Sequence, residues 1–118
     1  MKHPGMIVLF RFPHVDLEQG KLRPALLLGQ LPGDHDDQLI CMISSQLHHA
    51  VPDFDELCLL SDEDFPSSGL KKPSLIRIGR LAVVEGRILV GSLGTIAPAR
   101  LQRIKQRLAA WLVPRETS

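Results

Sequence analysis

Three residues suited to handling a phosphate stand at or near the ends of apolar runs in this 118-residue chain. Arg23 comes just before one such run, Ser44 just after a second, and Arg77 lies within a third. An arginine offers a planar fork of N–H donors that matches phosphate oxygens, and a serine hydroxyl can donate to the same group. Binding and catalytic groups concentrate where strands pass into loops. The three residues therefore predict a phosphate-handling site, provided that the fold brings the three runs together.

Each of these residues also has an ordinary structural explanation. Arg23 could be a surface arginine paired with a nearby carboxylate, and Arg77 could face outward from a strand. Ser44 and Ser45 could satisfy backbone groups of the loop that follows their strand. No Gly-x-Ser-x-Gly elbow surrounds the two serines, which disfavours a serine hydrolase. Residue type and position alone leave both explanations open.

The five histidines lack the spacing of a metal site. The neighbours His48 and His49 would point to opposite faces of a strand, which is a poor arrangement for shared ligation. His14 lies in a polar connection and could act as a general acid or base, because its pKa is near neutral pH, or could be an exposed loop residue. No P-loop or GxGxxG motif occurs. We therefore expect neither a metal nor a cofactor.

The composition is that of a single soluble domain spanning residues 1–118, with 44% hydrophobic and 23% charged residues. No apolar run approaches the ~20 residues that a membrane-spanning helix needs, and the first residues lack the pattern of a signal peptide. We expect a cytoplasmic protein with no membrane partner. Cys41 and Cys58 lie in apolar runs, which predicts two buried thiols in a reducing compartment, with a disulfide as the alternative.

The net charge of +1 conceals a strong asymmetry. Residues 1–65 hold four Lys/Arg against eleven Asp/Glu, a balance of −7, whereas residues 66–118 hold ten against two, a balance of +8. A basic surface could meet an anion such as RNA or an acidic protein. Alternatively, the two halves interleave in the fold and their fields cancel.

The hydrophobic pattern predicts many short strands and one terminal helix. Successive apolar residues in 38–45 indicate a central strand buried on both faces. Ser61 is expected to cap a helical turn over 61–65, and residues 98–112 to form a helix whose basic residues face the solvent. Without βαβ alternation, this pattern favours an α+β, mainly β domain built on a small antiparallel barrel. The remaining strands are expected over residues 6–12, 24–30, 54–60, 74–78, 80–84 and 87–90.

The same segments, in this order, resemble the signature of the MazF/PemK family of toxin endoribonucleases. Glu18-Gln19-Gly20 with Arg23-Pro24 matches its Glu-Gln-Gly-x-x-Arg-Pro motif, and Ile43–Gln46 matches its Ile/Val-Thr-Ser segment. Ser74 and the strand after it match a further segment. The resemblance extends from about residue 5 to residue 112, and an ordered set of motifs over this length is far more specific than any one of them.

The resemblance implies a small SH3-like antiparallel barrel of the CcdB/MazF type with a C-terminal helix. It implies a homodimer that binds single-stranded RNA along a groove and cleaves it without metal. The 2′-hydroxyl attacks the adjacent phosphorus and leaves a 2′,3′-cyclic phosphate and a free 5′-hydroxyl. Positioning and charge stabilisation carry most of such a reaction. The resemblance also implies a cognate antitoxin with an acidic, partly disordered tail that occupies the groove.

Residue by residue, the resemblance assigns roles to positions of this chain. Arg23 matches the arginine that stabilises the transition state, and Ser44 matches the catalytic threonine or serine. Glu18 falls on the loop glutamate, and Arg77 aligns with an arginine that some members use as an acid or for charge stabilisation. The further residues expected to contact RNA are Ser45, Gln46, Lys21, His14, Phe12 and Lys71.

The chain also departs from the family pattern. Gly79 stands where some members carry an aspartate, and Ala82–Glu85 replaces a frequent Arg-Thr-Ile-Asp. These departures leave the general base unassigned. They favour a second hypothesis, a non-enzymatic binder on the same barrel, which would be a CcdB-like toxin acting on a protein such as gyrase or a regulator. The presence of Arg23 and Ser44 favours the endoribonuclease.

Overall fold

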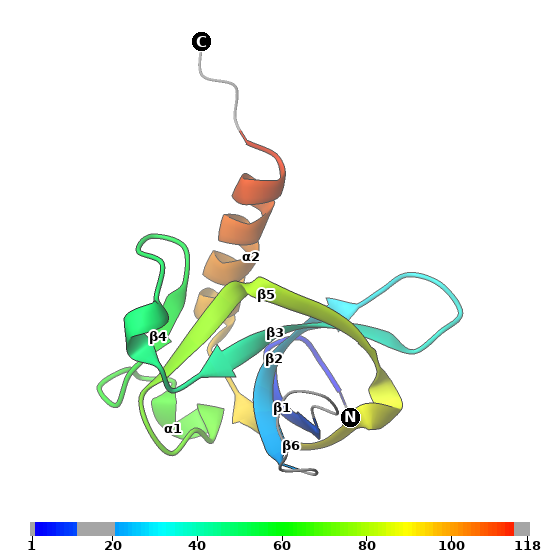
Figure 1. Cartoon of the computed structure of the whole chain (residues 1–118), viewed down its shortest axis with the longest axis horizontal. Helices are drawn as coiled ribbons and strands as arrows, with labels where there is room; N and C mark the ends of the chain where they lie inside the picture. Colours follow the sequence, from blue (N-terminus) through cyan, green and yellow to red (C-terminus); the bar gives the residue numbers. More distant parts are fainter. Residues whose placement is uncertain (1, 12–20, 115–118) are drawn as a thin grey trace.

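The computed structural model describes residues 2–11 and 21–114, which form a curved antiparallel sheet with one long helix against it (Figure 1). The strand order is β4-β5-β3-β2-β1-β6. Helix α2 packs with its first half on the sheet, while its C-terminal end projects beyond it (Figure 1). The strands are β1 Met6–Arg11, β2 Leu22–Gln30, β3 Asp37–Ser44, β4 Glu56–Cys58, β5 Ser74–Glu85 and β6 Leu89–Thr95. The helices are α1 Phe65–Ser68 and α2 Pro98–Leu112, and the 3₁₀ turns are η1 Leu47–His49 and η2 Gly86–Ile88.

The fold confirms the mainly β class and the C-terminal helix. Strand β3 pairs with β2 on one side and β5 on the other, as expected of a central strand. The helix occupies residues 98–112 as predicted, and Pro98 stands in its first turn, where a missing N–H is tolerated. Within the described ranges, the end strands β4 and β6 do not pair with each other. Closure into an SH3-like barrel therefore stays a prediction.

Two predictions about local structure were wrong. The strands expected over 74–78 and 80–84 are one strand, β5, whose pairing with β3 is irregular near its middle. Ser61 does not cap a helix, because α1 begins at Phe65 with Asp64 at its N-cap. The carboxylate of Asp62 instead accepts a hydrogen bond from the backbone N–H of Leu59 at 2.7 Å. This contact holds the segment before α1 in a turn.

The sheet carries a hydrophobic cluster on each face. On one face, Ile104 and Leu108 of α2 pack over strand residues such as Leu26 and Ile76. On the other, the sheet curls around an enclosed cluster. Alternation along each strand divides the side chains between these faces. The enclosed cluster comprises Val8, Phe10, Ala25, Leu27, Ile40 and Leu89, with Met6, Met42, Ala82 and Val84 at its margin.

The prediction that the basic residues of α2 form a solvated face holds for the exposed Lys105, but it was wrong for the arginines, which bind carboxylates. The Arg100 side chain is 8% exposed and donates to Asp64 through Nε and Nη2, at 2.8 and 2.9 Å. It also donates to Glu56 at 3.0 Å and to Asp62 at 3.1 Å. Arg103 and Arg107 bind the same Glu56 carboxylate, at 2.8 and 2.7 Å. Three arginines of the basic half are thus neutralised by three acids of the acidic half.

This ion-pair cluster shifts the pKa of its best-placed carboxyl group. The hydrogen bonds from Arg100 lower the pKa of Asp64, and the backbone N–H of Ala97 contributes in the same direction at 3.0 Å. Asp64 thereby joins α1 to the start of α2. The charges on this side of the molecule are largely satisfied by one another.

Both cysteines are buried and unpaired, as the apolar runs predicted. Burial raises the pKa of the Cys41 thiol to about 12, so it stays protonated at neutral pH and is a poor nucleophile. Among the described helices, none combines the length and apolar character needed to cross a membrane.

Candidate functional site

The strand register brings the predicted phosphate-handling residues onto one face of the sheet. Met42 of β3 pairs with Ala25 of β2 on one side and with Arg77 of β5 on the other. Ala25–Met42 is the last β2–β3 pair at this end, and Arg23 and Ser44 each lie two residues beyond it on the same face of their strands. Residues separated by more than fifty positions in the chain therefore meet beside the enclosed cluster.

These residues line a hollow of about 880 Å³, here called the groove. This volume lies in the upper part of the range of roughly 300–1,000 Å³ typical of ligand sites. Seven predicted residues line it, namely Lys21, Arg23, Ser44, Ser45, Gln46, Lys71 and Arg77. Apolar side chains, including Met42 and Leu93, make up much of the remaining wall.

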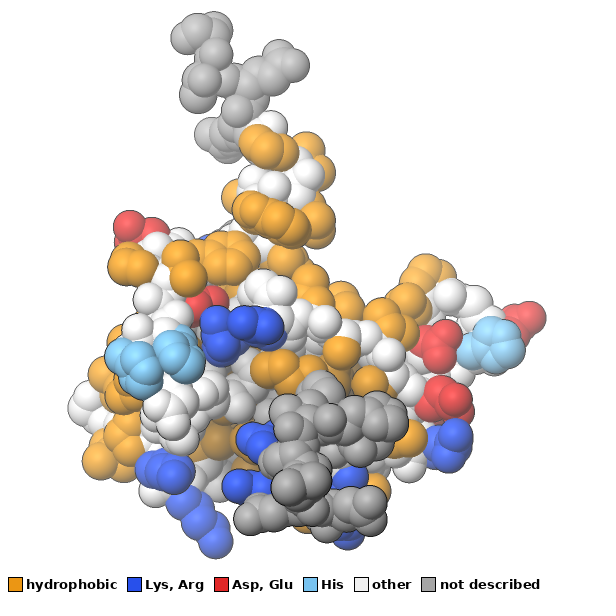
Figure 2. Space-filling view, in the orientation of Figure 1, with side chains coloured by type: hydrophobic (Ala, Val, Ile, Leu, Met, Phe, Trp, Pro, Cys, Tyr) orange, Lys and Arg blue, Asp and Glu red, His pale blue; other side chains and the backbone are white. Residues whose placement is uncertain are grey.

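The lining of the groove is strongly cationic. Its described residues include six lysines and arginines and no aspartate or glutamate: Lys21, Arg23, Lys71, Lys72, Arg77 and Arg80. Lys and Arg side chains gather over the lower half of the face shown in Figure 2. A cleft lined by one sign of charge concentrates the opposite charge. Both explanations of the charge asymmetry therefore apply. The arginines of α2 are neutralised by acids of the other half, whereas the cations of the groove form a basic surface that could bind an anion.

Ser44 satisfies a loop backbone group and can still act on a ligand. Its Oγ accepts a hydrogen bond from the backbone N–H of Gln46 at 3.0 Å. A hydroxyl that accepts in this way keeps its own proton available for donation. The contact fixes the oxygen at the end of β3, where it borders the groove. The structural explanation of Ser44 and the functional one are thus compatible.

Three predicted residues, Glu18, His14 and Phe12, lie outside the described residues, so their roles stay predictions. Two of the cations that line the groove, Lys72 and Arg80, were not predicted from the sequence as site residues. Lys72 could have been found as the neighbour of Lys71. Arg80 carried no such signal, because the irregularity in β5 that brings it to the groove cannot be recognised in the sequence.

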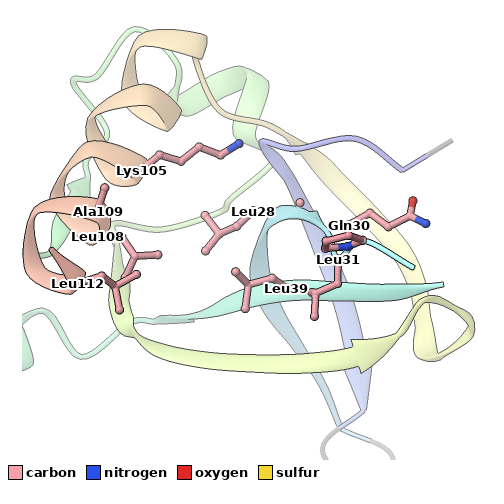
Figure 3. A pocket seen from close by; sticks show the side chains of 10 residues that line it. Leu28, Gln30, Leu31, Leu39, Lys105, Leu108, Ala109 and Leu112 are labelled. Atoms are coloured by element: carbon pink, nitrogen blue, oxygen red, sulfur yellow. The ribbon is translucent and has the colours of Figure 1, made fainter. Parts of the chain in front are cut away.

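A second hollow, of about 340 Å³, lies between the second half of α2 and the turn that joins β2 to β3 (Figure 3). Leu28, Leu31 and Leu39 of the sheet side face Leu108 and Leu112 of the helix. Its lining is largely apolar, so it has little capacity for chemistry. It matters instead as an uncovered apolar surface.

One group of potential metal ligands occurs in the described part of the chain. Ligand atoms of Cys58, Asp62 and Asp64 lie within 4.8 Å of one another. Both carboxylates are bound to the Arg100 guanidinium. The Arg100 guanidinium already occupies the position that a metal ion would need. We therefore interpret these three residues as part of the ion-pair cluster and not as a metal site.

Comparison with known proteins agrees with the motif order. The family model described as "PemK-like, MazF-like toxin of type II toxin-antitoxin system" matches residues 3–112. A search of curated proteins found no match. The matched range includes every described residue that lines the groove.

Proposed function

Because the chain belongs to the PemK-like, MazF-like toxins of type II toxin–antitoxin systems, we propose that it is an endoribonuclease that cleaves single-stranded RNA in the groove. The observation that carries this proposal is the cationic groove without a described carboxylate, in which Arg23, Ser44 and Arg77 share one face. A polyanionic strand suits such a surface. The proposed fold remains the SH3-like barrel of the CcdB/MazF type.

In this proposal, the 2′-hydroxyl of the substrate attacks the neighbouring phosphorus. The P–O5′ bond breaks, leaving a 2′,3′-cyclic phosphate and a 5′-hydroxyl. Arg23 stabilises the charge on the phosphoryl oxygens through its donor fork, and Ser44 donates its free proton to the same group. Arg77 adds positive charge or protonates the leaving oxygen. Glu18 is the candidate for the remaining proton transfer, and no metal is required.

The direct test is cleavage of mixed-sequence single-stranded RNA by antitoxin-free protein in EDTA, with the product ends identified. We expect cyclic phosphate at one end and 5′-hydroxyl at the other. Cleavage that disappears in EDTA would contradict the metal-independent mechanism. Intact RNA under all conditions would reject the nuclease and favour the CcdB-like alternative, in which the protein binds a target such as gyrase.

We also propose that the cognate antitoxin places an acidic segment in the groove. The six cations of its lining match such a segment as well as they match RNA. Acidic peptide and RNA should then compete for the same residues. A synthetic poly-glutamate peptide, used as the probe, is expected to reduce RNA binding more strongly at low salt.

The protein is further proposed to be a homodimer that associates through the projecting end of α2. Leu101, Ile104, Leu108 and Trp111 form one helical stripe, yet Trp111 is 65% exposed. It lies three residues from Leu108, on the end of α2 that projects beyond the sheet. A twofold pair would allow each copy to cover the apolar end of the other.

Trp111→Glu is expected to convert the dimer to a monomer, because it places a charge in the proposed interface. The matched control is Gln106→Glu, which adds the same charge on the opposite side of α2. The molar mass in solution, measured by light scattering, decides the question. A wild-type monomer, or a Trp111→Glu dimer of unchanged affinity, would contradict this interface.

A further inference from the structure

We propose that Arg80 is a phosphate-binding residue of the groove, presented by the irregularity in β5, and that it contacts the phosphate next to the one held by Arg23 and Ser44. This inference rests on the proposed function of the groove and extends it. It gives a role to a residue that no motif singled out. It also explains one of the departures from the family pattern.

The pairing of β5 with β3 skips three residues. Cys41 of β3 pairs with Leu81, whereas the next residue, Met42, pairs with Arg77. Residues 78–80 therefore have no partner in β3. Such an insertion is a form of β-bulge, and bulges are frequent beside active sites because they redirect side chains.

The skipped residues change which face Arg80 occupies. In a regular strand, Arg77 and Arg80 would point to opposite faces, because side chains alternate. Here, Arg77 lies opposite Met42, and Ala82 also belongs to the enclosed face. Counting back from Ala82 sets Arg80 on that face too. Both arginines line the groove in consequence.

A brace from the loop before β4 holds the bulge. One carboxylate oxygen of Asp55 accepts from the backbone N–H of Ile78 at 3.1 Å, and the other accepts from Val51 at 2.9 Å. Arg107 donates to the backbone carbonyl of Asp55 at 2.9 Å. The unpaired backbone of the bulge thus gains a specific partner, which fixes its shape.

Gly79 fits the same arrangement. A Cβ added at this position would lie 3.3 Å from the Phe54 ring, closer than side chains usually approach. The glycine lets the bulge lie against that ring, and the next residue then turns into the groove. The absence of the aspartate that some family members carry here is therefore accompanied by an added cation, Arg80.

Arg80 is exposed and, within residues 2–11 and 21–114, its guanidinium has no hydrogen-bond or ion-pair partner. It differs in this from Arg100, whose donors are occupied by carboxylates. Three residues along a strand span at most roughly 10 Å. At that separation from Arg77, Arg80 is better placed to bind a neighbouring phosphate than to bind the phosphate that Arg77 contacts.

The test measures binding without cleavage. The probe is a mixed-sequence single-stranded oligonucleotide with 2′-O-methyl groups throughout, which has no attacking hydroxyl. For single strands, each neutralised phosphate contributes about 0.7 to the slope of log affinity against log salt. Arg80→Gln should reduce the magnitude of this slope by about 0.7 and weaken binding roughly eightfold at about 50 mM salt. Arg80→Lys should keep the slope, because it keeps the charge.

Arg87→Gln is the matched control, since Arg87 is 77% exposed in η2 and lies outside the groove. An unchanged slope in Arg80→Gln, or an equal decrease in Arg87→Gln, would overturn the inference. Wild-type protein that does not bind the probe would overturn both this inference and the nuclease. Wild-type protein that binds with the expected Arg80 contribution, yet leaves natural RNA intact, would reject the nuclease alone.

Discussion

Arg23→Ala is expected to reduce the turnover of RNA by about 10²–10³-fold, a loss of roughly 2.7–4 kcal/mol of transition-state stabilisation. Arg23 lines the groove together with Ser44 and Arg77, and it lies two residues beyond the Ala25–Met42–Arg77 row of the sheet. Charge on the phosphoryl oxygens develops as the 2′-oxygen attacks, so a fixed guanidinium contributes more in the transition state than in the bound substrate. The measurement is the single-turnover rate at saturating RNA, because an effect confined to binding would disappear there.

Two variants separate the possible roles of this side chain. Arg23→Lys keeps the charge but loses the planar fork, so we expect a rate between those of the wild type and Arg23→Ala. Ser44→Ala should also slow the reaction, because the proposed mechanism uses its hydroxyl as a hydrogen-bond donor to the phosphoryl group in the same groove. Arg87→Gln, outside the groove, should cleave normally. A decrease of less than about tenfold in Arg23→Ala would exclude Arg23 from the chemistry.

The sequence predicted the site better than the elements around it. Short motifs at strand ends are local signals, and an antiparallel register then brings such ends together. Seven predicted residues line the groove for this reason. Arg80 could not be predicted, since its orientation depends on a hydrogen bond from Ile78 to Asp55, 23 residues away. A bulge such as the one in β5 can be recognised only when the residues that pair with it in the partner strand are known.

The terminal helix illustrates the opposite failure. Its bounds followed from Pro98 and the apolar spacing, both of which are local. The interpretation of its basic residues as a solvated face failed for the three arginines, because periodicity shows which positions are polar but not which groups they contact. Arg100 meets acids that lie 36 to 44 positions earlier in the chain. Only the fold reveals such partners.

Arg100→Met is expected to destabilise the protein by about 3–5 kcal/mol, because it leaves buried carboxylates without their partner. The side chains of Glu56 and Asp64 are each 7% exposed, so water cannot replace the lost guanidinium. Glu56 keeps Arg103 and Arg107, whereas Asp64 keeps the backbone N–H of Ala97. For a domain of this size, thermal unfolding should shift downward by roughly 12 °C or more.

Arg87→Met is the control for this prediction, since the Arg87–Glu85 pair is exposed and its removal should leave the unfolding temperature unchanged.

The pH dependence of stability gives an independent check. Because the pKa of Asp64 is lowered in the folded state, the stability that its ion pair contributes is complete above the ordinary pKa of about 4 and is lost as the pH falls through the lowered value. The difference in free energy of unfolding between wild type and Arg100→Met should therefore be constant from neutral pH down to about 5 and shrink in stronger acid. A difference that stays constant into strong acid would show that the destabilisation arises from lost packing of the arginine stem and not from the unpaired carboxylate.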